Sequence, residues 1–216
     1  MQAPVITDPT PKPREIYAVG EWKNNGEMIA DAAAMGYVPG LVLDATYGRG
    51  TFWKTFRPER LVTNDIVVGR ADHCYDFRHF PREWERTFDC VVLDAPYKLN
   101  GTPSGDENDK RYGVDVKAKV PRRLRMQHEG LIECERIVRV GGFVLVKVQD
   151  QVASGRVHWM TRALPITAEL HDLRLVDEFL YVTKKPRPQP VANQVHARRN
   201  VSSLLVFTHE VGGGRR

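Results

Sequence analysis

Short apolar runs that end in an acidic residue recur along this 216-residue chain, and they restrict its fold more than any other feature. Residues 91–93 are continuously apolar and are followed by Asp94. Residues 41–45 and 61–64 are similar runs, with Asp44 and Asp65 at their ends. Runs of this length are typical of parallel strands covered on both faces, and ligands bind where such strands end. The sequence therefore predicts an α/β domain with acids along one edge of its sheet.

Helical patterns alternate with these runs. We expect helices that begin after Asn24, near Thr51, and over about 121–139 and 155–170, the last broken at Pro165. Further strands are expected before Asp76 and over 143–148, 175–183 and 202–208. The predicted fold is α/β of the Rossmann-like class, a mostly parallel seven-stranded sheet with an antiparallel C-terminal edge pair and helices on both faces.

The composition predicts one domain. We expect a flexible N-terminal arm over residues 1–14, a single domain over 15–210 with a basic loop insertion around 98–123, and a flexible tail over 211–216. No stretch approaches the roughly 18 apolar residues of a membrane span. The three cysteines, Cys74, Cys90 and Cys134, fit neither a disulfide framework nor a zinc site. A cytoplasmic protein without a metal is the expectation.

A glycine-containing turn follows the first acid-terminated run. Gly48 and Gly50 stand between Asp44 and a predicted helix start, and such turns let backbone N–H groups approach a nucleoside-bearing cofactor closely. Asp65 follows about twenty residues later, where an acid can accept hydrogen bonds from ribose hydroxyls. Asp76 and Phe77 offer an acceptor and an aromatic face after the next predicted strand.

The sequence Asp94-Ala95-Pro96-Tyr97 forms a corner after the most apolar run. An acid and backbone carbonyls beside an aromatic face suit a planar base with an exocyclic amino group. An ordinary strand-to-loop turn has the same composition, so these four residues alone leave both interpretations open.

Positive charge is concentrated in two segments. Residues 110–125 and 184–216 each hold seven Lys or Arg against one acid, although the whole chain carries a net charge of only +5. This distribution is typical of a surface for a polyanion such as nucleic acid. The candidate contacts are Lys98, Lys110, Arg111, Lys117, Lys119, Arg122, Arg123, Arg187, Arg198 and Arg199.

Over roughly residues 38–208 the chain resembles the S-adenosylmethionine-dependent DNA methyltransferases that modify adenine N6 or cytosine N4. Their glycine loop, D-x-x-x-G-x-G-T, is matched from Asp44 to Thr51, and their catalytic signature, an acid or polar residue before Pro-Pro-aromatic, is matched with Ala95 in place of the first proline. The resemblance implies S-adenosyl-L-methionine as cofactor. The cofactor contacts that it implies are Asp44, Ala45, Thr46, Gly48, Gly50, Thr51, Phe52, Asp65, Ile66, Asp76, Phe77 and Asp94.

The resemblance also implies direct methyl transfer to a base that has left the duplex. Asp94 and the following backbone carbonyl would accept hydrogen bonds from the target amine, and Tyr97 would stack on the base. The catalytic residues implied are Asp94, Ala95, Pro96 and Tyr97. DNA is the expected partner ahead of RNA, no membrane is expected, and monomer and dimer stay open.

Three other functions are compatible with parts of the sequence. An RNA methyltransferase would act on a base, or on the ribose 2′-hydroxyl with Lys147 and Asp94, unless Lys147 is simply an exposed strand-end residue. A catalytically silent nucleic-acid-binding protein would share the fold, although none of the acids at positions 44, 65 and 94 is lost. A small-molecule or protein methyltransferase would leave the two basic segments poorly explained.

Overall fold

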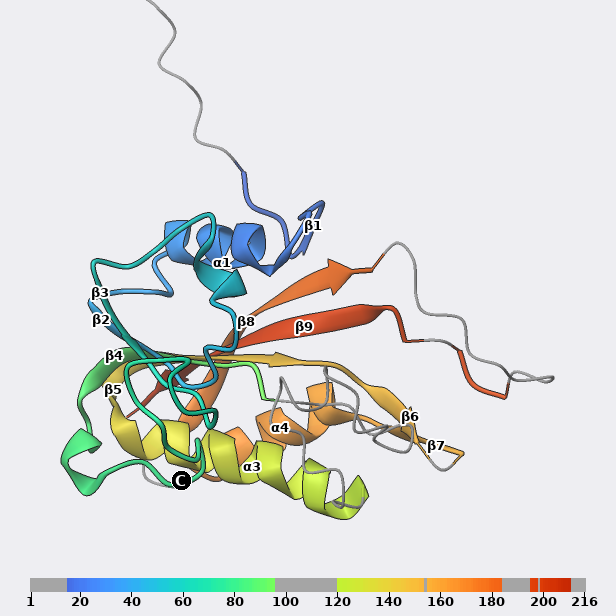
Figure 1. The fold of residues 1–216 in the computed structure, drawn as a ribbon. Coiled ribbons are helices and arrows are strands. Elements are labelled where there is room, and N and C mark those ends of the chain that lie inside the picture. The colour runs from blue at the N-terminus through green and yellow to red at the C-terminus, as the bar shows by residue number, and fades with distance from the viewer. Residues whose placement is uncertain (1–14, 96–119, 154, 184–194, 198, 211–216) are drawn as a thin grey trace, which may run out of the picture.

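The main sheet has seven strands and is mostly parallel (Figure 1). The computed structural model describes residues 15–95, 120–153, 155–183, 195–197 and 199–210. The spatial order is β1-β8-β9-β5-β4-β2-β3, with β9 antiparallel to both of its neighbours. The bounds are β1 Val19–Gly20, β2 Leu41–Asp44, β3 Arg60–Thr63, β4 Phe88–Leu93, β5 Val138–Val148, β8 Leu173–Val182 and β9 Val201–His209. The expected parallel sheet with a C-terminal antiparallel pair, β8 and β9, is confirmed, and the two-residue β1 adds an unforeseen outer strand.

Helices cover both faces of the sheet (Figure 1). Helix α1, Asn25–Ala34, lies on one face, and α3, Val120–Ile137, lies with α4, Met160–Glu169, on the other. The start of α1 is fixed as expected by Asn24, whose side chain accepts a hydrogen bond of 3.2 Å from the Glu27 N–H. None of the helices in the described part of the chain is long and apolar enough to cross a bilayer.

Strand β4 lies at the centre of the core and is buried along its whole length. Val91 and Leu93 belong to the apolar cluster under α3, whereas Cys90 and Val92 belong to the cluster under α1. Successive side chains of a strand point to opposite faces, so a strand between two helical layers must be apolar at every position. This burial explains the continuous apolar run before Asp94.

Two elements near the glycine turn are shorter than the sequence predicted. The helix expected from Thr51 is a single 3₁₀ turn, Thr51–Trp53, and Pro58 disfavours helical geometry in the residue before it. The strand expected before Asp76 is only one parallel bridge, between Asn64 and His73. The Asn64 side chain takes the backbone groups of Tyr75 that a longer strand would use.

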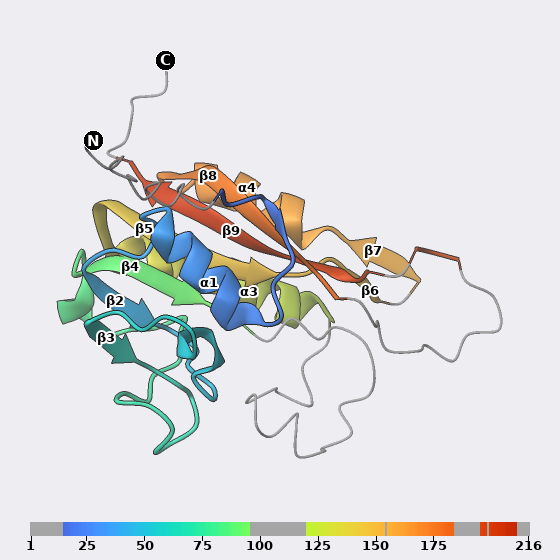
Figure 2. The same ribbon diagram turned by 90° about the horizontal axis from the view of Figure 1, so that it is seen from above.

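The helix expected over 155–170 begins only at Met160. An antiparallel hairpin precedes it, formed by β6, Gln151–Ala153, and β7, Arg156–His158, with Gly155 at a φ of 70° in its turn. A positive φ favours glycine and allows the tight reversal. Pro165 lies inside α4 and does not break it, contrary to expectation. Both ribbon views show the hairpin projecting beyond the main sheet (Figures 1 and 2).

Candidate active site

The carboxylate of Asp44 closes the turn that follows β2. Its Oδ1 accepts a 3.0 Å hydrogen bond from the Thr46 N–H, and its Oδ2 accepts a 2.6 Å bond from the Trp53 indole. The side chain is buried, and burial is the main reason that the pKa of Asp44 rises to about 7. The charges of Asp94 and Asp65 raise this pKa further, while the two hydrogen bonds oppose the rise. The ionisation of Asp44 therefore depends on the charges of both neighbouring acids.

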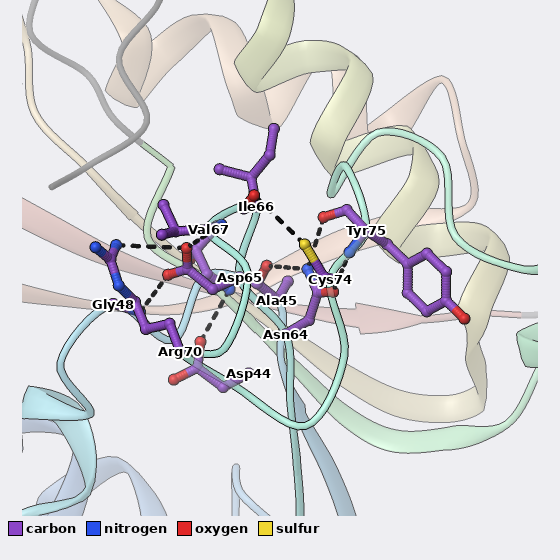
Figure 3. A network of polar contacts seen from close by, with 11 residues as sticks. Asp44, Ala45, Gly48, Asn64, Asp65, Ile66, Val67, Arg70, Cys74 and Tyr75 are labelled. Atoms are coloured by element: carbon purple, nitrogen blue, oxygen red, sulfur yellow. Dashed lines mark hydrogen bonds and ion pairs between the residues drawn. The ribbon is translucent and has the colours of Figure 1, made fainter. Parts of the chain in front are cut away.

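The glycine turn is attached to the acid that follows β3 (Figure 3). The Gly48 N–H donates to Asp65 Oδ2 at 2.8 Å, and Oδ1 of the same carboxylate accepts from the Val67 N–H at 2.8 Å. Gly48 has a φ of 58°, and a Cβ built on it would meet only the Thr46 carbonyl oxygen, at 3.8 Å. The backbone at Gly48 thus faces open space, and Asp65 fixes its orientation.

Asn64 connects the ends of β2 and β3 to the following loop, and the sequence analysis missed it (Figure 3). Its fully buried side chain donates to the Ala45 and Tyr75 carbonyl oxygens, each at 3.0 Å, and accepts from the Tyr75 N–H at 2.8 Å. An amide has donors and an acceptor, so one buried residue can satisfy three backbone groups. Its place just before Asp65, at the end of an apolar run, was the available signal.

The corner after β4 is connected to the same turn. The Asp94 N–H donates to Thr46 Oγ1 at 2.8 Å, and Ala95 is buried in the core. Burial raises the pKa of the Asp94 carboxyl, and the positive charge of Lys147 opposes that rise. Lys147 is buried on the neighbouring strand β5, so it is not the exposed strand-end residue that one interpretation expected. Pro96 and Tyr97 lie outside the described residues.

The predicted pair Asp76 and Phe77 has other partners in this structure. Asp76 pairs with Arg78, whose guanidinium holds the pKa of that carboxyl below its usual value. Phe77 is buried against α3, where a Cβ on Gly130 would lie only 2.6 Å from the Phe77 ring. The adenine contact proposed for these two residues stays a prediction.

The remaining predicted cofactor residues differ in exposure. Thr51 and Ile66 are exposed, whereas Phe52 is buried in the cluster under α1. The structure therefore brings Asp44, Asp65 and Asp94 together around one turn.

Only three of the ten predicted nucleic-acid contacts fall on described residues. Arg122 is exposed on the first turn of α3, Arg123 is buried beside it, and Arg199 lies over the Trp159 ring. The residues that lie outside the described part of the chain are Lys98, Lys110, Arg111, Lys117, Lys119, Arg187 and Arg198. Within the described part, no group of three His, Cys, Asp or Glu side chains is placed to hold a metal ion.

Solved structures with similar folds are methyltransferases. N-methyltransferase NodS from Bradyrhizobium japonicum, solved with S-adenosyl-L-homocysteine, has a TM-score of 0.51 at 12% identity, covering 85% of each chain. A proposed RNA methyltransferase from Pyrococcus horikoshii has a TM-score of 0.52 at 11% identity, covering 88% of this chain and 83% of that one. A proposed DNA modification methylase from Thermus thermophilus, solved with S-adenosyl-L-methionine, has a TM-score of 0.42 at 15% identity, covering 82% of this chain.

The present chain spans only 58% of that Thermus protein. No protein-family model matches the sequence, and a search of curated proteins finds no significant match. At these identities the similarity concerns the fold and not the substrate. The chain has the fold of the class I methyltransferases.

Proposed function

We propose that this protein is an S-adenosyl-L-methionine-dependent methyltransferase. The observation that carries the proposal is the hydrogen-bonded junction in which Asp65 holds Gly48 and Thr46 holds Asp94. The junction stands at the carboxyl ends of three adjacent parallel strands, β3, β2 and β4, where open α/β sheets bind ligands. NodS, which shares the fold, was solved with the demethylated form of this cofactor.

The residues at this junction fit the chemistry of that cofactor. The open space beside Gly48 admits close approach of a ligand to the backbone. Asp65 Oδ1 accepts from Val67 and Arg70, whereas Oδ2, which accepts from the Gly48 N–H, keeps a lone pair for a ribose hydroxyl. When ionised, Asp44 and Asp94 add negative charge, which favours a sulfonium cation nearby. When bound, the cofactor supplies an electrophilic methyl group on that sulfonium.

We further propose that the methyl acceptor is the exocyclic amino group of a nucleobase in DNA, adenine N6 or cytosine N4. Such an amine is a weak nucleophile because its lone pair is delocalised into the ring. An ionised Asp94 accepts a hydrogen bond from this amine and favours its pyramidal form. The backbone carbonyl that follows Asp94 offers a second hydrogen-bond acceptor. Lys147 helps to keep Asp94 ionised in its buried position.

Burial of Lys147 gives specific support to a second candidate, ribose 2′-O-methylation of RNA. That reaction needs a group near Asp94 that assists a hydroxyl nucleophile, and the buried Lys147 is such a group. We rank it below base methylation because the ribose reaction does not need the Pro-Tyr turn after Asp94. The nature of the methylated nucleoside separates the two.

Methyl transfer from labelled cofactor to DNA, with two variants beside the wild type, tests the proposal. Asp94→Ala should abolish transfer but leave cofactor affinity measurable by calorimetry, since Asp94 is assigned to the amine. Gly48→Val should lose cofactor affinity, because valine does not tolerate a φ of 58° and fills the space beside the turn. Near-normal turnover of Asp94→Ala, or unchanged cofactor affinity of Gly48→Val, would contradict the assignment.

A further inference from the structure

Two arginines from distant parts of the chain lie over one tryptophan. The guanidinium carbon of Arg162 is 4.3 Å from the centroid of the Trp159 ring, and that of Arg199 is 4.4 Å from it. Both contacts are within the range of a cation–π interaction. Trp159 keeps 39% of its surface exposed, so the group, here called the Trp159 clamp, is open to solvent.

Surrounding hydrogen bonds hold the Trp159 clamp in place. Asp150 accepts from the N–H and the hydroxyl of Thr161, each at 3.0 Å, and this fixes the start of α4 between Trp159 and Arg162. The Gln149 side chain donates to the Arg199 carbonyl oxygen at 3.2 Å. A positioned aromatic side chain and a positioned backbone reduce the ordering entropy that binding must overcome.

The chain that continues from β5 connects the candidate active site to the Trp159 clamp. Gln149, which holds Arg199, is two residues beyond Lys147 on the same β5 path, and Lys147 acts on Asp94. Two residues of extended chain span about 7 Å, so Gln149 follows Lys147 closely along the chain. The β6–β7 hairpin, which projects from this edge, separates Gln149 from Trp159 in sequence (Figures 1 and 2).

The two clamp arginines differ from other arginines of the described residues in their ion pairs. Arg70, Arg78, Arg86 and Arg136 each form an ion pair with a carboxylate. Within the described part of the chain, no carboxylate forms an ion pair with either clamp arginine, and the buried Nε of Arg199 has no hydrogen-bond partner there. Two such guanidinium groups on one ring suit an anion with several acceptor oxygens.

We infer that the Trp159 clamp binds a backbone phosphate of the DNA strand that carries the target base. The inference rests on the proposed function, because a polynucleotide substrate is what supplies backbone phosphates. Phosphate contacts position a substrate without reading its sequence. Arg162 and Trp159 are absent from the two basic segments, so charge clustering along the sequence did not reveal them.

Fluorescence anisotropy with a labelled duplex DNA tests the inference in the presence of S-adenosyl-L-homocysteine, which cannot donate a methyl group. Arg162→Gln and Arg199→Gln should each weaken binding by about three- to tenfold near ~0.1 M salt and lower the salt slope by about 1. The matched control is Arg60→Gln, at the exposed start of β3 and away from the carboxyl ends, which should leave affinity and slope unchanged. Trp159→Phe should keep most of the affinity, and Trp159→Leu should lose it.

Affinity and salt slope equal to wild type in the Arg162→Gln/Arg199→Gln double variant would overturn the inference. Lost affinity for a matched RNA with unchanged affinity for DNA would overturn the choice of DNA. The proposed function can be refuted independently of the clamp. If the wild type methylates no base while the double variant still loses DNA affinity, the clamp stands and the proposed reaction does not.

Discussion

The charge of Asp94 is controlled by two opposing influences at the residue scale. Burial raises the pKa of its carboxyl, and Lys147 lowers it. The proposed reaction needs the ionised form, because a carboxylate is a stronger acceptor for the target amine than a protonated carboxyl, whose O–H is itself a donor. The rate should therefore rise with pH as Asp94 loses its proton.

Lys147→Met removes the positive charge that opposes the burial effect. The pKa of Asp94 should rise further, so the acidic limb of the plot of kcat against pH should move to higher pH. Lys147→Arg keeps the charge and is the matched control, with a limb close to that of the wild type. An acidic limb at the same pH in wild type and Lys147→Met would show that Lys147 does not act on the catalytic ionisation.

Asp44 links the ionisation of the site to stability. Its pKa is about 7 in the folded chain, above the ordinary value of 3.8, so its contribution to folding is greatest at low pH and is lost as the pH rises through about 7. The Trp53 indole bond opposes this loss because it stabilises the ionised form. That bond therefore matters most above neutral pH.

Trp53→Phe should cost more stability at about pH 8.5 than at about pH 5, by on the order of 1 kcal/mol, because a bond to a charged acceptor is lost only when Asp44 is ionised. The cavity left by the smaller ring is common to both conditions and cancels in the difference. Trp22→Phe, which removes a 2.8 Å indole bond to Asp31, is the control and should show a smaller pH dependence. Equal losses at both pH values in urea unfolding would refute this role of Trp53.

At the scale of elements, the contact between α3 and the loop after β3 depends on a glycine, which has no Cβ. Gly130 lies at the middle of α3, and a Cβ there would be 2.6 Å from the Phe77 ring. Helix propensity alone favours alanine over glycine by about 0.5–1 kcal/mol. The overlap with Phe77 should outweigh that gain.

Gly130→Ala should therefore destabilise the protein by about 1–3 kcal/mol, the usual cost of overpacking a core. Phe77→Leu makes room at the same place, so the double variant should lose less stability than the two single variants together. Urea unfolding of the four proteins measures this coupling. A gain in stability in Gly130→Ala would mean that the helix moves away from Phe77 without cost.

The elements predictable from the sequence are those whose pattern is local. Continuous apolar runs located β2, β3 and β4, because burial on both faces leaves a signal within a few residues. The junction acids Asp44, Asp65 and Asp94 followed from these runs, since parallel strands end at one edge. Their three-dimensional proximity could be predicted without knowledge of any side-chain contact.

The features that the sequence did not predict depend on partners distant in the chain. Asn64 acts through the backbone of Tyr75, and Arg199 meets Trp159 from forty residues away. Strand β7 lies within the segment predicted as helix, because three-residue strands are too short to show an alternating pattern. Contacts between separate segments therefore decided the first two cases, and the shortness of the strands decided the third.

At the scale of the whole molecule, the sheet order places chemistry and charge on one side. The adjacent strands β3, β2, β4 and β5 deliver in sequence Asp65, Asp44, Asp94 and Lys147 at their carboxyl ends. The path that continues from β5 leads to the hairpin and the Trp159 clamp. One edge of the sheet thus combines the proposed cofactor site, the proposed catalytic acid and a basic surface.

The central claim is that this edge methylates the amino group of a nucleobase. Identification of the product tests it most directly: the protein is incubated with labelled S-adenosyl-L-methionine and DNA or RNA, and the polymer is digested to nucleosides for mass spectrometry. We expect label in N6-methyladenine or N4-methylcytosine from DNA, and none with Asp94→Ala. Label in a 2′-O-methylated ribose, or label that persists in Asp94→Ala, would contradict the account.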